Sequence, residues 1–150
     1  MTVHSNPASI SLPLIDMAGV REGDPSAIAR AGEAIRKACS EIGFFYIINH
    51  GVPQKVIDAA MAAAKTFFAF PAEVKRQVAV NKRHRGWHAL GGALMYEATK
   101  PDFKEFFSMG LELPEDDPCV LAGEALRGPN QWPDFMPELR LALDAYYEEI

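Results

Sequence analysis

The 150-residue sequence predicts a single globular domain of the α/β (α+β) class. It is 49% hydrophobic and 23% charged, a balance that supports a buried core and argues against disorder. In its first half, short apolar segments rich in β-branched and aromatic residues alternate with longer segments of helical periodicity. The chain is therefore expected to open in the order strand, helix, strand, helix.

The first strand and the first helix are predicted within residues 10–43. Ile10–Asp16 alternates apolar and polar residues, and Pro13 places this strand at the edge of a sheet. Asp24 is suited to cap a helix that begins at Pro25, and Gly43 ends that helix. Apolar residues at helical spacing predict its buried face at Ile28, Ala31, Ile35, Cys39 and Ile42.

A second strand and a second helix follow. Phe44–Ile48 is short and rich in aromatic and β-branched residues, which predicts a strand with both faces buried. A helix is expected from Pro53 to about Phe70, where Pro71 interrupts it, and Ala72–Arg76 can restart as a helical turn. The core stripe of the long helix is expected at Val56, Ile57, Ala60, Met61, Ala64, Phe67 and Phe68.

Residues 81–101 have a different character. They contain three glycines and two histidines, with Arg85, Trp87 and Tyr96 among them, and no sustained helical or strand period. A long loop of this composition inside a compact domain is more often functional than a simple connection. We therefore expect the candidate site in this segment.

The remaining segments are predicted from alternation and from turn residues. Phe103–Leu113 indicates a strand or hairpin arm, Pro114–Pro118 a solvated acidic turn, and Gly128–Pro133 a second turn. A last helix begins at Pro137 and reaches Ile150 with no residue that ends a helix, so we expect a longer protein. Its apolar side is expected at Leu139, Leu143, Tyr146 and Tyr147.

Charge and cysteine content exclude several classes of protein. The net charge of −5 and the absence of a Lys/Arg run argue against a nucleic-acid partner. No apolar run reaches the roughly 18 residues that a membrane span needs, and Met1–Pro13 lacks the features of a signal peptide, so a cytoplasmic protein is expected. The two cysteines, Cys39 and Cys119, are far apart and predict neither a disulfide framework nor a cysteine zinc site.

Several motifs occur in an order that resembles the amino-terminal region of the isopenicillin N synthase-like oxygenases. They are LPLID, EIGFFYIINHGVP, FFAFPAEVK, RGW followed by LGG, KPDFKEFFSMG and GPNQWP. The resemblance covers about residues 10–150. It implies that residues 1–150 are an N-terminal domain whose helices and strands brace a double-stranded β-helix, or jelly roll. The iron-binding jelly roll is expected after residue 150 and is absent from the sequence.

The resembled enzymes are non-haem Fe(II) oxygenases, most of which consume 2-oxoglutarate. The resemblance therefore implies that the complete protein is a 2-oxoglutarate/Fe(II)-dependent dioxygenase that oxidises a small molecule, with no nucleic-acid or membrane partner. Hydroxylation, desaturation, ring closure and ethylene formation all occur in this group, and the sequence does not choose among them. The 150 residues alone are expected to be inactive.

The iron ligands of the family cannot be found in this sequence. The family uses a His-x-Asp/Glu pair with a distant His, but His4, His50, His84 and His88 are followed two places on by Asn6, Val52, Gly86 and Leu90. The Arg-x-Ser that anchors 2-oxoglutarate is also absent. We assign no catalytic and no metal-binding residue here.

His50 and the pair His84 and His88 are two candidate metal sites, and each has a better explanation. His50 follows a strand, but Gly51 and Pro53 make it better explained as a turn residue whose imidazole satisfies a backbone group. His84 and His88 have the i, i+4 spacing of zinc ligands, but Gly86 weakens a helix there and no further ligand completes the set.

The resemblance places the loop after residue 84 over the mouth of the jelly roll, where it helps to form the substrate pocket. Arg85, His88 and Tyr96 are therefore the candidate substrate-binding residues. Arg85 suits a substrate carboxylate and equally suits an acidic neighbour. Trp87 is expected in the core more than in the pocket wall. Lys104-Glu105 are expected in a surface ion pair or an internal brace.

Two alternatives to the oxygenase function stay open: a non-catalytic module and an unrelated phosphate-binding domain. The chain is either an oxygenase fragment or a complete non-catalytic binding or interaction module derived from that scaffold. An unrelated phosphate-binding α/β domain is weaker, because neither GxxxxGK[ST] nor GxGxxG occurs. The sequence encoded downstream decides between the first two.

Overall fold

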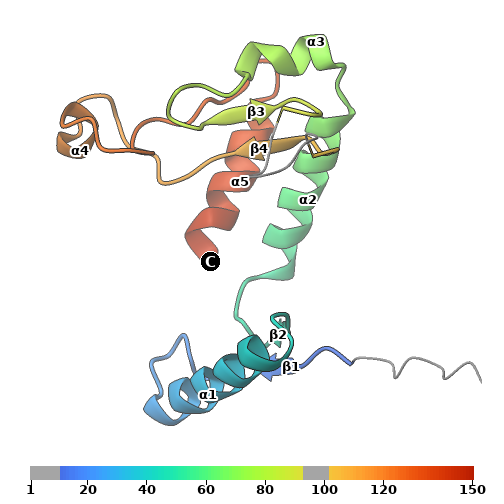
Figure 1. The fold of residues 1–150 in the computed structure, drawn as a ribbon, viewed down its shortest axis with the longest axis vertical. Coiled ribbons are helices and arrows are strands. Elements are labelled where there is room, and N and C mark those ends of the chain that lie inside the picture. The colour runs from blue at the N-terminus through green and yellow to red at the C-terminus, as the bar shows by residue number, and fades with distance from the viewer. Residues whose placement is uncertain (1–10, 93–101) are drawn as a thin grey trace, which may run out of the picture. The chain divides into compact units, whose positions relative to one another are not determined.

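The computed structural model describes residues 11–92 and 102–150. Contacts divide the chain into two compact units, Met1–Val52 (unit 1) and Pro53–Ile150 (unit 2), and each is described by itself. Both units combine helices with short strands (Figure 1), as the predicted α/β (α+β) class requires. Within the described ranges, every helix is too short or too polar to cross a membrane.

Unit 1 is a strand-helix-strand unit. Strands β1 (Leu14–Asp16) and β2 (Tyr46–Ile48) pair in parallel, with Ile15 opposite Ile47. Parallel neighbours need a crossover connection, and helix α1 (Pro25–Glu41) supplies it. The Asp24 carboxylate accepts a hydrogen bond from the Ser26 amide at 2.9 Å. The predicted strand, helix cap and second strand are thereby confirmed.

The predicted buried face of α1 is right at Ala31 and wrong at Ile28, Cys39 and Ile42. The helix buries Ala27, Ala31 and Ala38, whereas Ile28 is 48% exposed and Cys39 is exposed. Small side chains allow a helix to pack closely against its neighbours. Ala27 and Ala38 each lie next in sequence to a larger predicted position, so the buried face is rotated there by about one residue from the predicted one. Cys39 is therefore not a core residue of unit 1.

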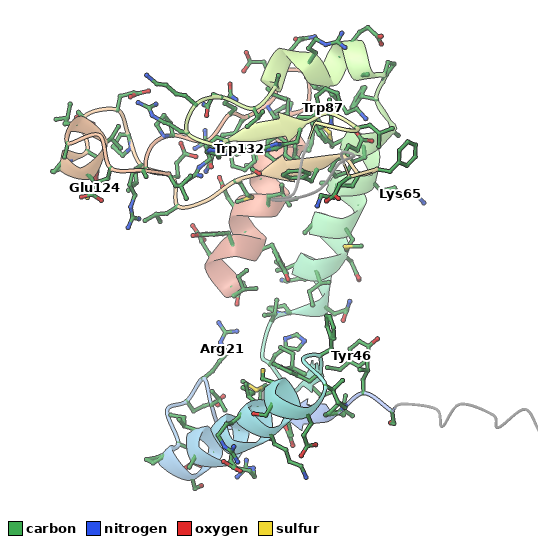
Figure 2. All side chains as sticks on the ribbon, viewed as in Figure 1. Arg21, Tyr46, Lys65, Trp87, Glu124 and Trp132 are labelled. Atoms are coloured by element: carbon green, nitrogen blue, oxygen red, sulfur yellow. The ribbon has the colours of Figure 1, made fainter. Side chains whose placement is uncertain are left out.

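The prediction that the second strand is buried on both faces is also wrong for unit 1. Phe44 is 72% exposed and Tyr46, labelled in Figure 2, is 63% exposed. The physical reason is that unit 1 has a single helix to cover its sheet. Apolar composition correctly indicated the strand, but burial depends on what packs against it.

Unit 2 contains a pair of helices and an antiparallel ribbon. Helices α2 (Gln54–Ala69) and α5 (Pro137–Glu149) lie side by side (Figure 1). Strands β3 (Gly86–His88) and β4 (Phe106–Ser108) pair with Trp87 opposite Phe107. The shorter elements are α3 (Ala72–Lys75), the 3₁₀ turn η1 (Arg76–Val78) and α4 (Pro118–Leu121).

The core of unit 2 joins these elements around Phe67. This side chain has no exposed surface, and its ring meets those of Phe68 and Phe107 edge to face, with centroids 5.3 and 5.2 Å apart. Such aromatic pairs add to the stability from burial alone. Met61, predicted in the core, is 68% exposed instead. The buried cluster consists of Ala63, Phe67, Val78, Trp87, Met136 and Leu139.

Candidate functional site

A buried ion pair supports the ribbon that carries the candidate residues. The Lys75 ammonium lies 2.8 Å from Oε2 of Glu105 and also donates to the Phe68 carbonyl at 2.9 Å. Trp87, labelled in Figure 2, donates from Nε1 to the same carboxylate at 2.7 Å. Buried charges need such partners, because desolvation otherwise disfavours them. The hydrogen bond from Lys75 is the main cause that lowers the pKa of Glu105.

This arrangement confirms the interpretation of Glu105 as an internal brace and of Trp87 as a core residue. Lys104 forms the surface pair, with Asp102 at 2.6 Å. The burial of Lys75 was not predicted, because nothing in the polar segment after Pro71 indicates that a lysine there is buried. Its partner Glu105 lies 30 residues away in the sequence.

His88 is the last residue of β3, and its side chain contacts two residues of β4. Its Nε2 lies 3.1 Å from Oγ of Ser108, and its ring stacks on that of Phe106 with centroids 3.9 Å apart. Burial, with a smaller effect from His84, lowers the pKa of His88 below its usual 6.5. The imidazole is therefore neutral at neutral pH. Ser108 had no distinguishing signal in the sequence and is brought to His88 by strand register.

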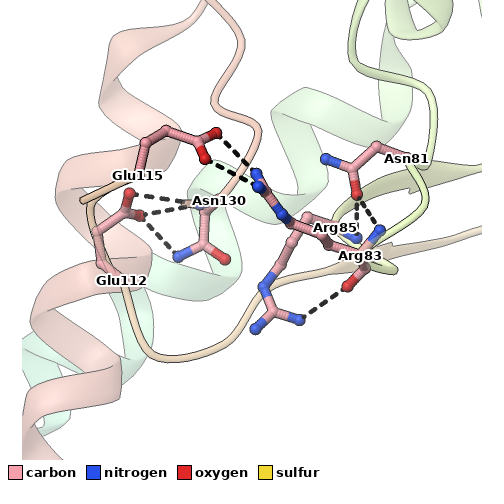
Figure 3. Close-up of polar contacts among 6 residues, drawn as sticks. All are labelled: Asn81, Arg83, Arg85, Glu112, Glu115 and Asn130. Carbon is pink, nitrogen blue, oxygen red and sulfur yellow. Dashed lines mark hydrogen bonds and ion pairs between the residues drawn. The ribbon is translucent and has the colours of Figure 1, made fainter. Parts of the chain in front are cut away.

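Arg85 is buried, with 8% of its surface exposed. Its Nη2 donates to the Leu126 carbonyl at 2.6 Å. Its Nη1 donates to the Arg83 carbonyl at 3.4 Å (Figure 3). Its Nε is buried without a hydrogen-bond partner among the described residues. Within the same residues no acidic side chain pairs with Arg85, so a neighbouring acid does not account for its charge there.

The acidic partner belongs to the neighbouring arginine. Arg83 forms a bidentate ion pair with Glu115: Nη1 donates to Oε1 at 2.7 Å and Nη2 donates to Oε2 at 2.8 Å (Figure 3). This hydrogen bonding lowers the pKa of Glu115. The predicted acidic turn at Pro114–Pro118 is therefore anchored to the segment before β3 and is not merely solvated, although the side chain of Glu115 remains 67% exposed.

The glycine-containing segment is more regular than predicted. Gly86–His88 forms strand β3. Because Gly86 has no side chain, the alternation of apolar and polar residues that predicts a strand is missing there. Tyr96, the third candidate substrate-binding residue, lies outside the described residues. Of the three candidates, Arg85 and His88 thus come from one short stretch of chain, while the placement of Tyr96 is not described.

The two metal hypotheses can be placed in the structure. His50 Nδ1 accepts a hydrogen bond from the Val52 amide at 3.1 Å, and Gly51 has a φ of +79°, so its predicted role as a turn residue is confirmed. In the ranges 11–92 and 102–150, no three His, Cys, Asp or Glu side chains gather in a way that would hold a metal ion. The residues that the structure describes therefore do not fit an iron site.

Comparison with known proteins gives a consistent result. Residues 12–135 match the family model described as non-haem dioxygenase in morphine synthesis, N-terminal. Azadirone synthase LFS from Melia azedarach is 41% identical over 125 residues, covering 81% of this chain and 37% of that protein. The 2-oxoglutarate-dependent dioxygenase caaD from Aspergillus niger is 36% identical over 146 residues, covering 94% and 44%. The chain thus spans less than half the length of these relatives.

Solved structures show the same fold. A 2OG-Fe(II) oxygenase family protein from Caulobacter crescentus superimposes with a TM-score of 0.68 at 26% identity, covering 92% of this chain and 43% of the other. JOX2, solved in complex with 2OG, Fe and JA, gives a TM-score of 0.63 at 31% identity and covers 96% and 38%. Such oxygenases have a jelly-roll core, and this chain corresponds to less than half of each.

Proposed function

This chain belongs to the N-terminal family of non-haem dioxygenases, and from that premise we propose that it is the N-terminal part of a 2-oxoglutarate/Fe(II)-dependent dioxygenase that oxidises a small molecule. The observation that carries the proposal is the similarity, over nearly the whole chain, to a curated 2-oxoglutarate-dependent dioxygenase. Its location is proposed to be the cytoplasm, on the sequence grounds given above.

Fe(II) and 2-oxoglutarate are proposed to be held by residues beyond this sequence. The sequence has neither the His-x-Asp/Glu pair nor the Arg-x-Ser of the family. When bound, the metal and its co-substrate would supply the oxidising chemistry, whereas the protein supplies orientation and exclusion of water. The 150 residues alone are therefore proposed to be inactive.

The part that this chain plays is proposed to be one wall of the substrate enclosure. Arg85, His88 and Tyr96 are proposed to contact the substrate. Two features support this role. The neutral imidazole of His88 presents hydrogen-bonding nitrogens beside the Ser108 hydroxyl, and the buried Nε of Arg85 has no hydrogen-bond partner among the described residues. The brace formed by Lys75 and Glu105 holds the ribbon from which Arg85 and His88 project.

The experiment compares two proteins, residues 1–150 alone and the same chain with its downstream coding sequence. Anaerobic calorimetry measures Fe(II) binding, and succinate release measures 2-oxoglutarate turnover. Only the longer protein is expected to bind iron stoichiometrically and to release succinate. A stoichiometric micromolar iron site in residues 1–150 overturns the assignment of ligands. A longer protein that neither binds iron nor turns over 2-oxoglutarate favours the non-catalytic module.

A further inference from the structure

Two adjacent amide side chains connect the candidate segment to a distant part of unit 2. Gln131 donates from Nε2 to the Ala79 carbonyl at 2.7 Å and to the Arg85 carbonyl at 2.6 Å. These carbonyls lie 52 and 46 residues before it in the chain. A primary amide has two N–H groups, so this one nitrogen uses both of them to join the end of η1 to the start of β3.

Gly86 is the residue that makes room for this amide. A Cβ at Gly86 would lie 2.6 Å from Nε2 of Gln131 and would overlap the Val78 carbonyl, and the φ of Gly86 is +108°. Both the close approach and the backbone angle require glycine. Gly86 and Gln131 therefore act together: the glycine opens the space, and the amide fills it.

Asn130 holds the other side of the segment. Its Oδ1 accepts from the Gly110 amide at 2.9 Å, and its Nδ2 donates to the Gly110 carbonyl at 2.8 Å. One side chain thus makes the pair of bonds that a neighbouring strand would make. Gly110 in turn lies against Arg85, since a Cβ there would be 2.6 Å from Nη2 of the guanidinium.

The two amides together fix Arg85 at both ends. Gln131 binds its backbone carbonyl, and Asn130 holds the Gly110 backbone on which its guanidinium rests. Arg85 directly precedes β3, whose pairing with β4 brings His88 to Ser108.

We propose that Asn130 and Gln131 are positioning residues, which set the backbone from which the substrate-contacting side chains of Arg85 and His88 project. This inference rests on the proposed function, because only there do Arg85 and His88 contact substrate. It adds that the shape of the substrate wall depends on residues 130–131, more than 40 positions further along the chain.

The test uses the full-length protein and two substitutions at position 131. Gln131→Ala removes both hydrogen bonds, and Gln131→Glu keeps the shape but places a carboxylate against two carbonyls. Hydrogen exchange is followed in peptides covering residues 79–88, where the Asn81 amide donates to the Arg85 carbonyl and the Val80 amide to the Trp87 carbonyl. We expect about tenfold faster exchange there, because loss of the two hydrogen bonds from Gln131 favours local opening.

A second measurement separates positioning from general stability. Titration of His88 by NMR is expected to show its pKa rising towards the usual value in both Gln131 variants, because a loosened segment admits water. Leu139→Ala, a core variant of unit 2, lowers stability and is expected to leave this titration unchanged. Gln54→Ala is the matched amide control, since Gln54 donates to Asp58 on the exposed surface of α2.

Unchanged exchange over residues 79–88 together with unchanged titration of His88 in Gln131→Glu overturns the proposal. An equal change of the titration in Leu139→Ala also overturns it, because the effect would then follow stability alone. Neither measurement needs iron, 2-oxoglutarate or substrate. Absence of succinate release in the wild-type protein therefore counts against the proposed function, separately from the outcome for Gln131.

Discussion

The ammonium of Lys75 and the carboxylate of Glu105 lie 2.8 Å apart, and the side chain of Lys75 is only 5% exposed. Glu105 also accepts the indole N–H of Trp87, so a single carboxylate satisfies two donors of the core region. The ring of Trp87 lies 5.4 Å from the ammonium, which adds a cation–π contact. This pair connects α3 to the ribbon that carries Arg85 and His88.

Glu105→Ala is expected to lower the free energy of unfolding by about 3 kcal/mol, because it leaves the buried Lys75 charge without its counter-ion. We place the value at the low end of the range for buried pairs, since the Glu105 side chain is 29% exposed. Urea denaturation measures it. Lys104→Ala, which breaks the exposed pair with Asp102, is the control and should cost less than about 1 kcal/mol. Equal losses in the two variants would contradict the prediction.

The same pair predicts a dependence of stability on pH. The Glu105 pKa is lowered in the folded protein from its ordinary 4.5, mainly by the hydrogen bond from Lys75. Its contribution is therefore complete above pH 4.5 and is lost as the pH falls through the lower folded pKa. The difference in unfolding free energy between wild type and Glu105→Gln should shrink across that acid range. A difference that stays constant from pH 7 into the acid range would show that the carboxylate charge does not contribute.

Gly86→Ala is expected to lower the free energy of unfolding by about 2–5 kcal/mol, because the added methyl group overlaps the Val78 carbonyl at a φ of +108°. Gly123→Ala is the matched control: its φ is +73°, but nothing lies within 4 Å of the added Cβ. That change should cost only about 1 kcal/mol. Thermal and urea denaturation compare the two, and a similar cost for both would show that crowding at Gly86 is relieved.

Gly32→Ala is expected to stabilise the protein. Gly32 lies inside α1, has no positive φ, and has open space where a Cβ would stand. Glycine in the middle of a helix costs roughly 0.5–1 kcal/mol relative to alanine, so the unfolding free energy should rise by about that amount. Urea denaturation that reports on unit 1 measures the change. A loss of stability would contradict the prediction.

Arg85→Ala, made in the full-length protein, tests the proposed substrate contact. Loss of charge-assisted hydrogen bonds costs about 1.5–3 kcal/mol, so substrate-dependent turnover should fall roughly tenfold to a hundredfold. Iron binding should remain, since the iron ligands are proposed to lie beyond this sequence. If instead the variant melts several degrees lower with unchanged kinetics at a permissive temperature, Arg85 acts through the Leu126 carbonyl as a structural brace.

Much of the local structure could be predicted because short-range chemistry decides it. The Asp24-Pro25 start of α1 and the interruption at Pro71 depend on groups a few residues apart. The motif order was sufficient to indicate the oxygenase family. The location of the iron ligands beyond this sequence, inferred from the lack of a His-x-Asp/Glu pair, stays a prediction. Substrate contacts at Arg85, His88 and Tyr96 stay predictions.

Tertiary structure alone decided which faces are buried and which distant residues meet. Ala27 is buried in unit 1, whereas the larger and more apolar Ile28 is 48% exposed. Lys75 is buried only because Glu105, 30 residues away, neutralises it, and Ser108 reaches His88 only through the register of β3 with β4. Local patterns in the sequence predicted the long helices and the first two strands, since these follow from hydrogen bonds and backbone angles within a few residues, but they missed β3. The burial of a residue depends on a partner whose position no local pattern encodes.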